Sequence, residues 1–178
     1  GAIEGTHTFT VRAVDAAGNR GPEAMRSITI DTTLPTVPSL VSPPATIGND
    51  ATPTFAFAGE PSATFQCSLT TGADNFTGCT SPFTATLLVA GDYVFKVRQI
   101  DQATNVGPVV SRPYSLDLTP PAVPTFTALG STSPANNNAP LVLGSAEPGS
   151  EVRLYGNDAT CAGAAIGGPV AASVFATP

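Results

Sequence analysis

Apolar and polar residues alternate along most of this chain, and the alternation predicts β-strands. In residues 7–13, Phe9 and Val11 alternate with threonines, a period of two that is typical of a strand with one buried face. Residues 15–19 (DAAGN) follow, and they favour a tight turn because Gly and Asn tolerate positive φ and Asp closes an Asx-turn. Residues 27–30 (SITI) are the next expected strand.

The same alternation continues through the middle of the chain. Phe55 and Phe57 alternate with Thr54, Ala56 and Ala58, which predicts a strand with one aromatic face. Turn signals rich in Gly and Pro separate this strand from others of similar length. The full expected set is a proline-containing edge at 38–44 and strands at 54–58, 64–69, 76–80, 83–89, 93–100 and 109–116. About seven strands with turns every 8–12 residues indicate a sandwich of two sheets.

The pattern is also periodic at a much longer distance. The segment Gly5–Pro22 (GTHTFTVRAVDAAGNRGP) recurs as Gly91–Pro108 (GDYVFKVRQIDQATNVGP), 86 residues later. Downstream, Asp31 and Pro38 recur at the same offset. A fixed period of this kind is the signature of a repeat protein, so the chain is interpreted as part of a tandem array.

A third copy begins after the second. Residues 137–155 align with residues 50–68 at an offset of 87, pairing Glu147 with Glu60 and Pro140 with Pro53. We therefore expect an all-β chain of three parts. These are the C-terminal part of a first unit (1–35), a complete unit (36–120) and the N-terminal part of a third unit (121–178).

The chain starts and stops at nearly the same phase of the repeat, because Gly1 matches Leu87 and Pro178 matches Gly91. Two interpretations follow. The chain is a slice of a longer polypeptide, or its last unit is completed by the first 33 residues of a neighbouring copy. The second interpretation would build a fibre by strand donation.

Composition narrows the possible functions. Gly (17) and Pro (18) are frequent, only 11% of the residues are charged, and the net charge is −6. A basic patch is the footprint of nucleic-acid binding, so no nucleic-acid partner is expected. No window approaches the roughly 18 apolar residues of a membrane span. The one histidine, His7, lies on an expected strand at one end of the chain, so no Ser-His-Asp set is expected. One His with three scattered Cys residues is not expected to supply the four ligands of a zinc site, and no enzyme activity is expected.

Several segments are recognisable as a family pattern. HTFTVRAVDAAGN followed by IDTTLP resembles the bacterial Ig-like tandem repeats of large secreted and cell-surface proteins, and ATFQCSLTTGADNFTGCTSP and SAEPGSEVRLYGNDATCAG look like sister versions. The strand around Tyr93 is similar to that of fibronectin type III domains. Three positions depart from the pattern: His7 replaces that Tyr in the first copy, Thr104 replaces the turn Gly18, and Gln99 stands where the first copy has Ala13.

The resemblance implies Ig-like sandwiches strung end to end at an extracellular or cell-surface location. Repeats of this class serve as stalks, spacers and adhesive fibres, and they also accompany secreted hydrolases. We expect a structural unit of a fibre, stalk or filament whose partners are neighbouring repeats or copies of itself. An adhesin module for sugar or protein and a spacer in a secreted enzyme are the alternatives. The proline-rich junctions DTTLPTVP and DLTPPAVP are expected to restrict bending.

The cysteines indicate a crosslink. Cys67 and Cys79 flank the expected hairpin turn of residues 64–80, and a disulfide there would contribute about 3 kcal/mol in the chain-entropy model and require an oxidising compartment. Two buried free thiols are the alternative, which the resemblance to extracellular proteins disfavours. Cys161 is left over, and its expected partner is a cysteine outside this chain or in another copy.

Oxygen-bearing side chains gather where units are expected to meet, and hard cations such as calcium prefer several oxygen ligands. Similar repeats in bacterial adhesins bind calcium at unit boundaries. The candidate ligands are Asp15, Asn19, Asp31 and Glu60 at the first junction and Asp101, Asn105, Asp117 and Glu147 at the second. The competing interpretation is that these Asp and Asn residues are ordinary turn residues and that both Glu residues begin ordinary Glu-Pro turns.

Overall fold

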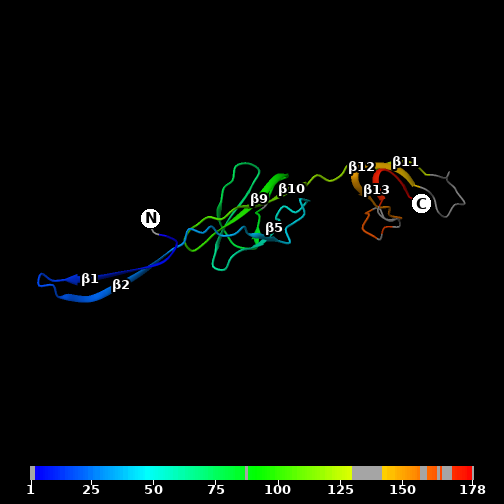
Figure 1. The fold of residues 1–178 in the computed structure, drawn as a ribbon. Helices are drawn as coiled ribbons and strands as arrows, with labels where there is room; N and C mark the ends of the chain where they lie inside the picture. Colours follow the sequence, from blue (N-terminus) through cyan, green and yellow to red (C-terminus); the bar gives the residue numbers. More distant parts are fainter. Residues whose placement is uncertain are drawn as a thin grey trace. The chain divides into compact units, whose positions relative to one another are not determined.

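The computed structural model describes residues 3–86, 88–129, 142–156, 160–163, 165 and 170–177. The described residues form strands and no helix, so this part of the chain is all-β. It therefore contains no helix that could span a membrane. The chain divides into two compact units, Gly1–Leu118 and Thr119–Pro178, which are traced in Figure 1.

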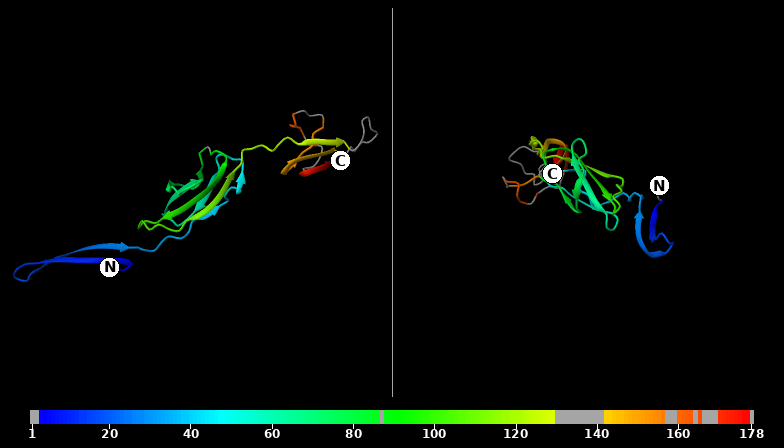
Figure 2. Two further views of the ribbon diagram at one scale, coloured as in Figure 1. Left: turned by 90° about the horizontal axis from the view of Figure 1, so that it is seen from above. Right: turned by 90° about the vertical axis from the view of Figure 1, so that its left-hand side faces the viewer.

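The first unit begins with a long hairpin. Strands β1 (Gly5–Val14) and β2 (Arg20–Ile30) pair antiparallel from Gly5 opposite Ile30 to Val14 opposite Arg20, and the two strands run side by side in both views of Figure 2. β1 and β2 form a two-stranded sheet of their own.

The rest of the first unit is a β-sandwich. One sheet has the order β4-β10-β9-β6-β7, and the other has the order β3-β5-β8. Their strands are β3 (Ser39–Val41), β4 (Ile47–Gly48), β5 (Thr54–Ala58), β6 (Thr64–Thr70), β7 (Thr77–Cys79), β8 (Phe83–Thr84), β9 (Gly91–Ile100) and β10 (Val110–Leu116). All pairings in this sandwich are antiparallel except that of β4 with β10.

The core lies between the two sheets. Phe55 of β5 stacks on Phe95 of β9 with ring centroids 4.2 Å apart, and neither ring is exposed to solvent. Tyr114 of β10 meets Phe55 edge-on and donates its hydroxyl hydrogen bond to the Asp50 carbonyl over 2.6 Å. The aromatic face predicted from the alternation of residues 54–58 is therefore the buried face. Burial of each such ring contributes about 1.5–3 kcal/mol.

Three predicted segments of the sandwich are shorter than expected, the edge at 38–44 being reduced to β3, and one strand was not predicted. The expected strand 83–89 ends at Thr84, because the amides of Ala85 and Leu88 instead bond to the carbonyls of Pro53 and Ala51 in an irregular segment; Leu87 lies outside the described residues. The expected strand 76–80 is reduced to β7. The unpredicted strand is β4, which has two residues and depends on its pairing with β10.

The second unit contains β11 (Thr125–Leu129), β12 (Val142–Val152) and β13 (Val170–Thr177) in one antiparallel sheet with the order β11-β12-β13. Thr125 lies opposite Ser145, and Phe126 lies opposite Gly144. These pairs follow the pairs Ser39–Ala58 and Leu40–Phe57 of the sandwich by 86 and 87 residues. Residues 137–141 of the predicted third copy, Pro140 among them, lie outside the described residues.

Candidate functional site

The linker between β2 and β3 is held by two side chains of the sandwich. The Thr36 amide donates a hydrogen bond to Glu60 Oε1 over 2.7 Å, and the Thr36 carbonyl accepts one from Gln99 Nε2 over 2.7 Å. Gln99 Nε2 also lies 3.3 Å from the Thr36 hydroxyl. We call Thr36, Glu60 and Gln99 the linker clamp. It fixes both hydrogen-bonding groups of one linker residue.

Gln99 is the centre of the clamp. Its side chain is completely buried, and its Oε1 accepts a hydrogen bond from the Glu60 amide over 2.9 Å. Gly59 makes this possible, because a Cβ at that position would lie 2.1 Å from Gln99 Oε1. The buried amide thus has partners for its oxygen and its nitrogen, as a buried polar group requires.

A second glycine brings the linker close to the sandwich. The Gly107 amide donates to the Gln99 carbonyl over 2.9 Å. A Cβ at Gly107 would approach the Pro35 carbonyl to 2.8 Å. Any larger residue at Gly107 would therefore displace the linker next to the clamp.

Glu60 accepts its hydrogen bond as a carboxylate. The Thr36 backbone amide, and after it the Thr36 side chain, hold the pKa of Glu60 below its ordinary value. Hydrogen bonds that favour the charged form act in this direction. Because the carboxylate is the better acceptor, this part of the clamp is strongest above the ordinary pKa of a glutamate.

The second unit contains the same contact. The Ala122 amide donates a hydrogen bond to Glu147 Oε2 over 2.9 Å. Ala122 follows Thr36 by 86 residues, and Glu147 follows Glu60 by 87. Each Glu-Pro turn therefore binds the amide of the linker that precedes it. Sequence reasoning assigned both glutamates to calcium or to ordinary turns and missed this role.

The predicted turn residues close two equivalent turns. Asn19 and Asn105 donate through their backbone amides to Asp15 Oδ1 and Asp101 Oδ1, each over 2.8 Å. Their side-chain amides donate to the second oxygen of the same carboxylates over 2.7 and 2.9 Å. Thr104 adopts a φ of 71° where Gly18 has 87°, so the turn forms despite the substitution of Thr for Gly.

The pKa values of both turn aspartates lie below the ordinary value. For Asp15 the principal cause is the hydrogen bond from the Asn19 side chain, followed by that from the Asn19 backbone. For Asp101 desolvation raises the pKa, and the hydrogen bonds from Asn105 outweigh it. Both carboxylates are thus used by their own turns.

The candidate calcium ligands occupy several separate places. Asp15 and Asn19 lie at the tip of the hairpin, whereas Asp31 follows the far end of β2, where its carbonyl accepts a hydrogen bond from Asn105 Nδ2 over 3.0 Å. The Asp117 amide donates to the Gly48 carbonyl. Among the described residues, no group of three or more His, Cys, Asp or Glu side chains is arranged to hold a metal ion. Calcium binding remains a prediction.

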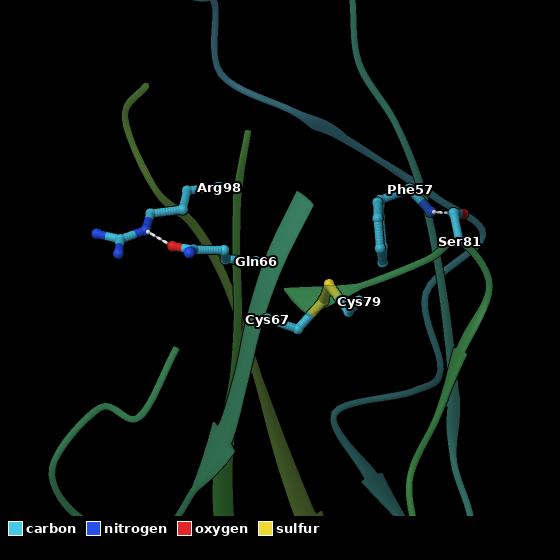
Figure 3. The surroundings of a disulfide bond; sticks show 6 residues. All are labelled: Phe57, Gln66, Cys67, Cys79, Ser81 and Arg98. Carbon is cyan, nitrogen blue, oxygen red and sulfur yellow. Dashed lines mark hydrogen bonds between the residues drawn. A yellow bond between two sulfur atoms is a disulfide. The ribbon is translucent and has the colours of Figure 1, made fainter. Parts of the chain in front are cut away.

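A disulfide joins Cys67 of β6 to Cys79 of β7, the pair expected from the sequence, with Cα atoms 5.8 Å apart (Figure 3). It closes the hairpin at the buried face of β6, where Cys67 lies opposite Val97 of β9. Cys161 is exposed and carries a free thiol.

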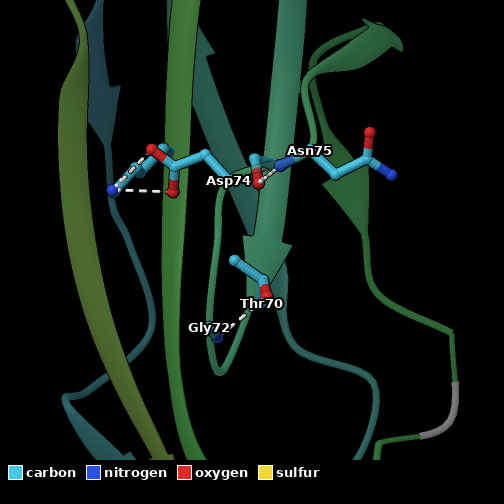
Figure 4. Close-up of polar contacts among 6 residues, drawn as sticks. Thr70, Gly72, Asp74 and Asn75 are labelled. Carbon is cyan, nitrogen blue, oxygen red and sulfur yellow. Dashed lines mark hydrogen bonds and ion pairs between the residues drawn. The ribbon is translucent and has the colours of Figure 1, made fainter.

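The opposite face of β6 and β9 is polar and is covered by the segment 71–76. Arg98 Nε donates to Gln66 Oε1 over 2.9 Å, and the Arg98 guanidinium lies 4.2 Å from the centre of the Phe76 ring. Lys96 forms an ion pair with Asp74 over 2.7 Å, and the Asn75 amide donates to the Ser68 hydroxyl (Figure 4). These contacts hold the β6–β7 connection against the sheet.

No family model matches this chain, and no curated protein matches it.

Proposed function

We propose that this chain is a run of Ig-like tandem repeats that serves as structural material in a bacterial extracellular fibre, stalk or surface filament. In this proposal the units supply length and stiffness, and no catalysis takes place in them. The observation that carries the proposal is the repeated linker contact, from Thr36 to Glu60 in one unit and from Ala122 to Glu147 in the next.

A repeat protein that transmits force needs defined linkers. Each unit in such an array contacts its neighbours in sequence, so length scales with copy number. A freely jointed linker would let the array coil up. Prolines at Pro35 and Pro38 fix φ, and the linker clamp binds the peptide groups between them. Each linker is thereby tied to the unit that follows it.

The disulfide also supports an extracellular structural role. The Cys67–Cys79 disulfide is the kind of bond that persists in oxidising compartments. It also ties the short strand β7 to β6, so the edge of the five-stranded sheet is held covalently.

The proposal is tested through the stiffness of the linkers. Glu147→Ala removes the acceptor for the Ala122 amide and should broaden the distribution of maximum dimensions measured by small-angle X-ray scattering. Glu151→Ala is the matched control, because Glu151 lies in β12 and forms an ion pair with Arg153. If Glu147→Ala and Glu151→Ala both scatter like the wild type, the Ala122–Glu147 contact does not set linker stiffness.

A second measurement addresses location. Antibodies against the chain, applied to intact cells that produce it, should label elongated surface structures in electron micrographs. Labelling confined to the cytoplasm would overturn the proposal. Tight binding of a glycan or protein by the isolated chain would favour the adhesin alternative over a purely structural role.

A further inference from the structure

The hairpin β1–β2 has one polar face and one apolar face. On the polar face Thr6 pairs with Thr29 and Thr8 with Ser27 through hydroxyl hydrogen bonds of 2.9 Å, and Arg12 forms an ion pair with Glu23. The other, more apolar face carries Phe9, Val11 and Ile28, which are 64%, 67% and 54% exposed, together with His7 and Arg26. A two-stranded hairpin alone is marginally stable in water, so this apolar face calls for a partner.

The complete unit shows which partner such a face takes. Phe9 lies opposite Arg26 in the hairpin, and Phe95 lies opposite Arg112 in β9–β10, 86 residues later. In the complete unit the face around Phe95 is covered by Phe55 of β5, and β9 pairs along its edge with β6. The hairpin thus corresponds to the strand pair β9–β10, whose inner face is covered by β5 and whose edge is paired with β6.

The second unit supplies strands of that type. β11 and β12 pair in the register of β3 and β5, and Val142 follows Phe55 by 87 residues. Phe126 occupies the position of Leu40 and is 67% exposed, whereas Leu40 packs against the core of the complete unit. The hairpin and the second unit therefore each expose an apolar residue whose counterpart is packed in one common core.

The edge of the second unit is compatible with the same pairing. Residues 153–156 follow Gln66–Leu69 of β6 by 87 residues. In the complete unit, that stretch of β6 pairs with β9. Residues 153–156 directly follow β12 and belong to no described strand.

We propose that the hairpin β1–β2 of one copy docks by its apolar face on the Thr119–Pro178 unit of a second copy and adds β1 to the edge at residues 153–156. The counterparts in β6 and β9 give the register, with Tyr155 opposite Thr10 and Leu154 opposite Val11. The contact is head-to-tail, so repeated docking builds an open chain of copies. The inference deepens the proposed structural role by naming how copies join.

The test uses chain 1–178 with Cys161→Ser, so that the free thiol cannot form disulfide-linked dimers. Light scattering after size exclusion should show oligomers that grow with protein concentration. Phe9→Asp should leave a monomer, because it places a charge on the donor face. Thr8→Asp on the polar face is the matched control and should assemble as before. A monomeric wild type at every concentration, or equal losses for Phe9→Asp and Thr8→Asp, would overturn the proposal.

The two surfaces can be separated by mixing variants. Phe126→Asp removes the acceptor and should also be monomeric. A mixture of Phe9→Asp and Phe126→Asp should form dimers that grow no further, because one variant keeps the acceptor and the other keeps the donor. A mixture that stays monomeric contradicts the proposal. A monomeric wild type whose hairpin amides are protected from hydrogen exchange also contradicts the proposal. That result would show that the hairpin docks on the second unit of its own chain.

Register provides an independent measurement. Thr10→Cys combined with Tyr155→Cys should yield a ladder of disulfide-linked oligomers under mild oxidation. Thr8→Cys with Tyr155→Cys places the thiols two residues out of register and should crosslink at least tenfold more slowly, because disulfide geometry tolerates little displacement. Equal rates would refute the register. The linker test is made in the Phe9→Asp background, which is monomeric in either case, so failure of assembly would leave it unaffected.

Discussion

The hairpin β1–β2 and the strand pair β9–β10 have the same design and opposite surroundings. Both pair a Phe with an Arg at the same position, and both close with the same Asp–Asn turn. Phe95 is fully buried, whereas Phe9 is 64% exposed. Register and turn are thus encoded within each hairpin, because they depend on local alternation and side-chain hydrogen bonds. Burial depends on which sheet lies opposite, and residues far away in the chain supply that sheet.

The largest difference in stability between the two regions is expected when the equivalent residues Phe95 and Phe9 are truncated to alanine. Phe95→Ala should destabilise the complete unit by about 3–5 kcal/mol, because it removes a buried ring and leaves a cavity against Phe55. Phe9→Ala in the monomer should change the free energy of unfolding by less than about 0.5 kcal/mol. Urea unfolding followed by tyrosine fluorescence measures both. Comparable losses would mean that the hairpin is already packed in solution.

The disulfide belongs to the complete unit alone, since Cys67 lies on β6 and the hairpin has no neighbouring strand of that kind. Replacing both Cys67 and Cys79 by Ser should lower the free energy of unfolding by about 3 kcal/mol, the value expected for closing a loop of this length. Thermal unfolding with and without reductant checks this prediction. The wild type in reductant should match the double variant, and Cys161→Ser should behave like the wild type.

Gln99 offers a sharper contrast, because its counterpart in the hairpin is Ala13. Gln99→Ala leaves the Glu60 amide and the Thr36 carbonyl without their buried partner, which should cost about 1–3 kcal/mol. Ala13→Gln adds an exposed amide to the hairpin and should be nearly neutral. Denaturant midpoints for the two variants provide the comparison. A neutral Gln99→Ala would show that water replaces the clamp.

Local alternation was sufficient to predict most of the sandwich strands, β5 with Phe55 and Phe57 among them, and the position of Cys67 and Cys79 on either side of the expected hairpin turn, with the family resemblance, predicted the disulfide. The clamp could not be predicted in the same way. Gln99 binds Thr36 and Glu60, which are 63 and 39 residues away in sequence, and no local pattern encodes such contacts. A glutamine at an inward position of an apolar strand was the available signal. The two-residue strand β4 is too short to carry any periodicity.

A smaller effect is expected at the turns. Thr104 has a φ of 71°, a conformation that costs a β-branched residue about 1–3 kcal/mol, part of which is offset because Gly loses more backbone entropy on folding. Thr104→Gly should therefore raise the stability of the complete unit by up to about 1 kcal/mol, and Gly18→Thr should loosen the hairpin turn. Unfolding measurements test the first change, and hydrogen exchange at the Asp15 amide tests the second. A destabilising Thr104→Gly would contradict the strain argument.

The smallest effect should be shared by both regions, because it depends on hydrogen bonds that both possess. The pKa values of Asp15 and Asp101 lie below the ordinary value of 3.8. A depressed folded pKa contributes stability that is present above the unfolded value and is lost as the pH falls through the folded one.

The amide resonances of Asn19 and Asn105 should therefore shift together in an acid titration monitored by NMR, with both midpoints below 3.8. Asp15→Asn should abolish the Asn19 transition and leave that of Asn105 in place. The two turns differ in one respect, because desolvation acts against the depression most strongly at Asp101. If the Asn105 resonance had its midpoint at the ordinary pKa of an aspartate while the Asn19 resonance did not, desolvation would cancel the hydrogen bonds at Asp101. The pKa of the turn aspartate would then depend on the surroundings of the turn.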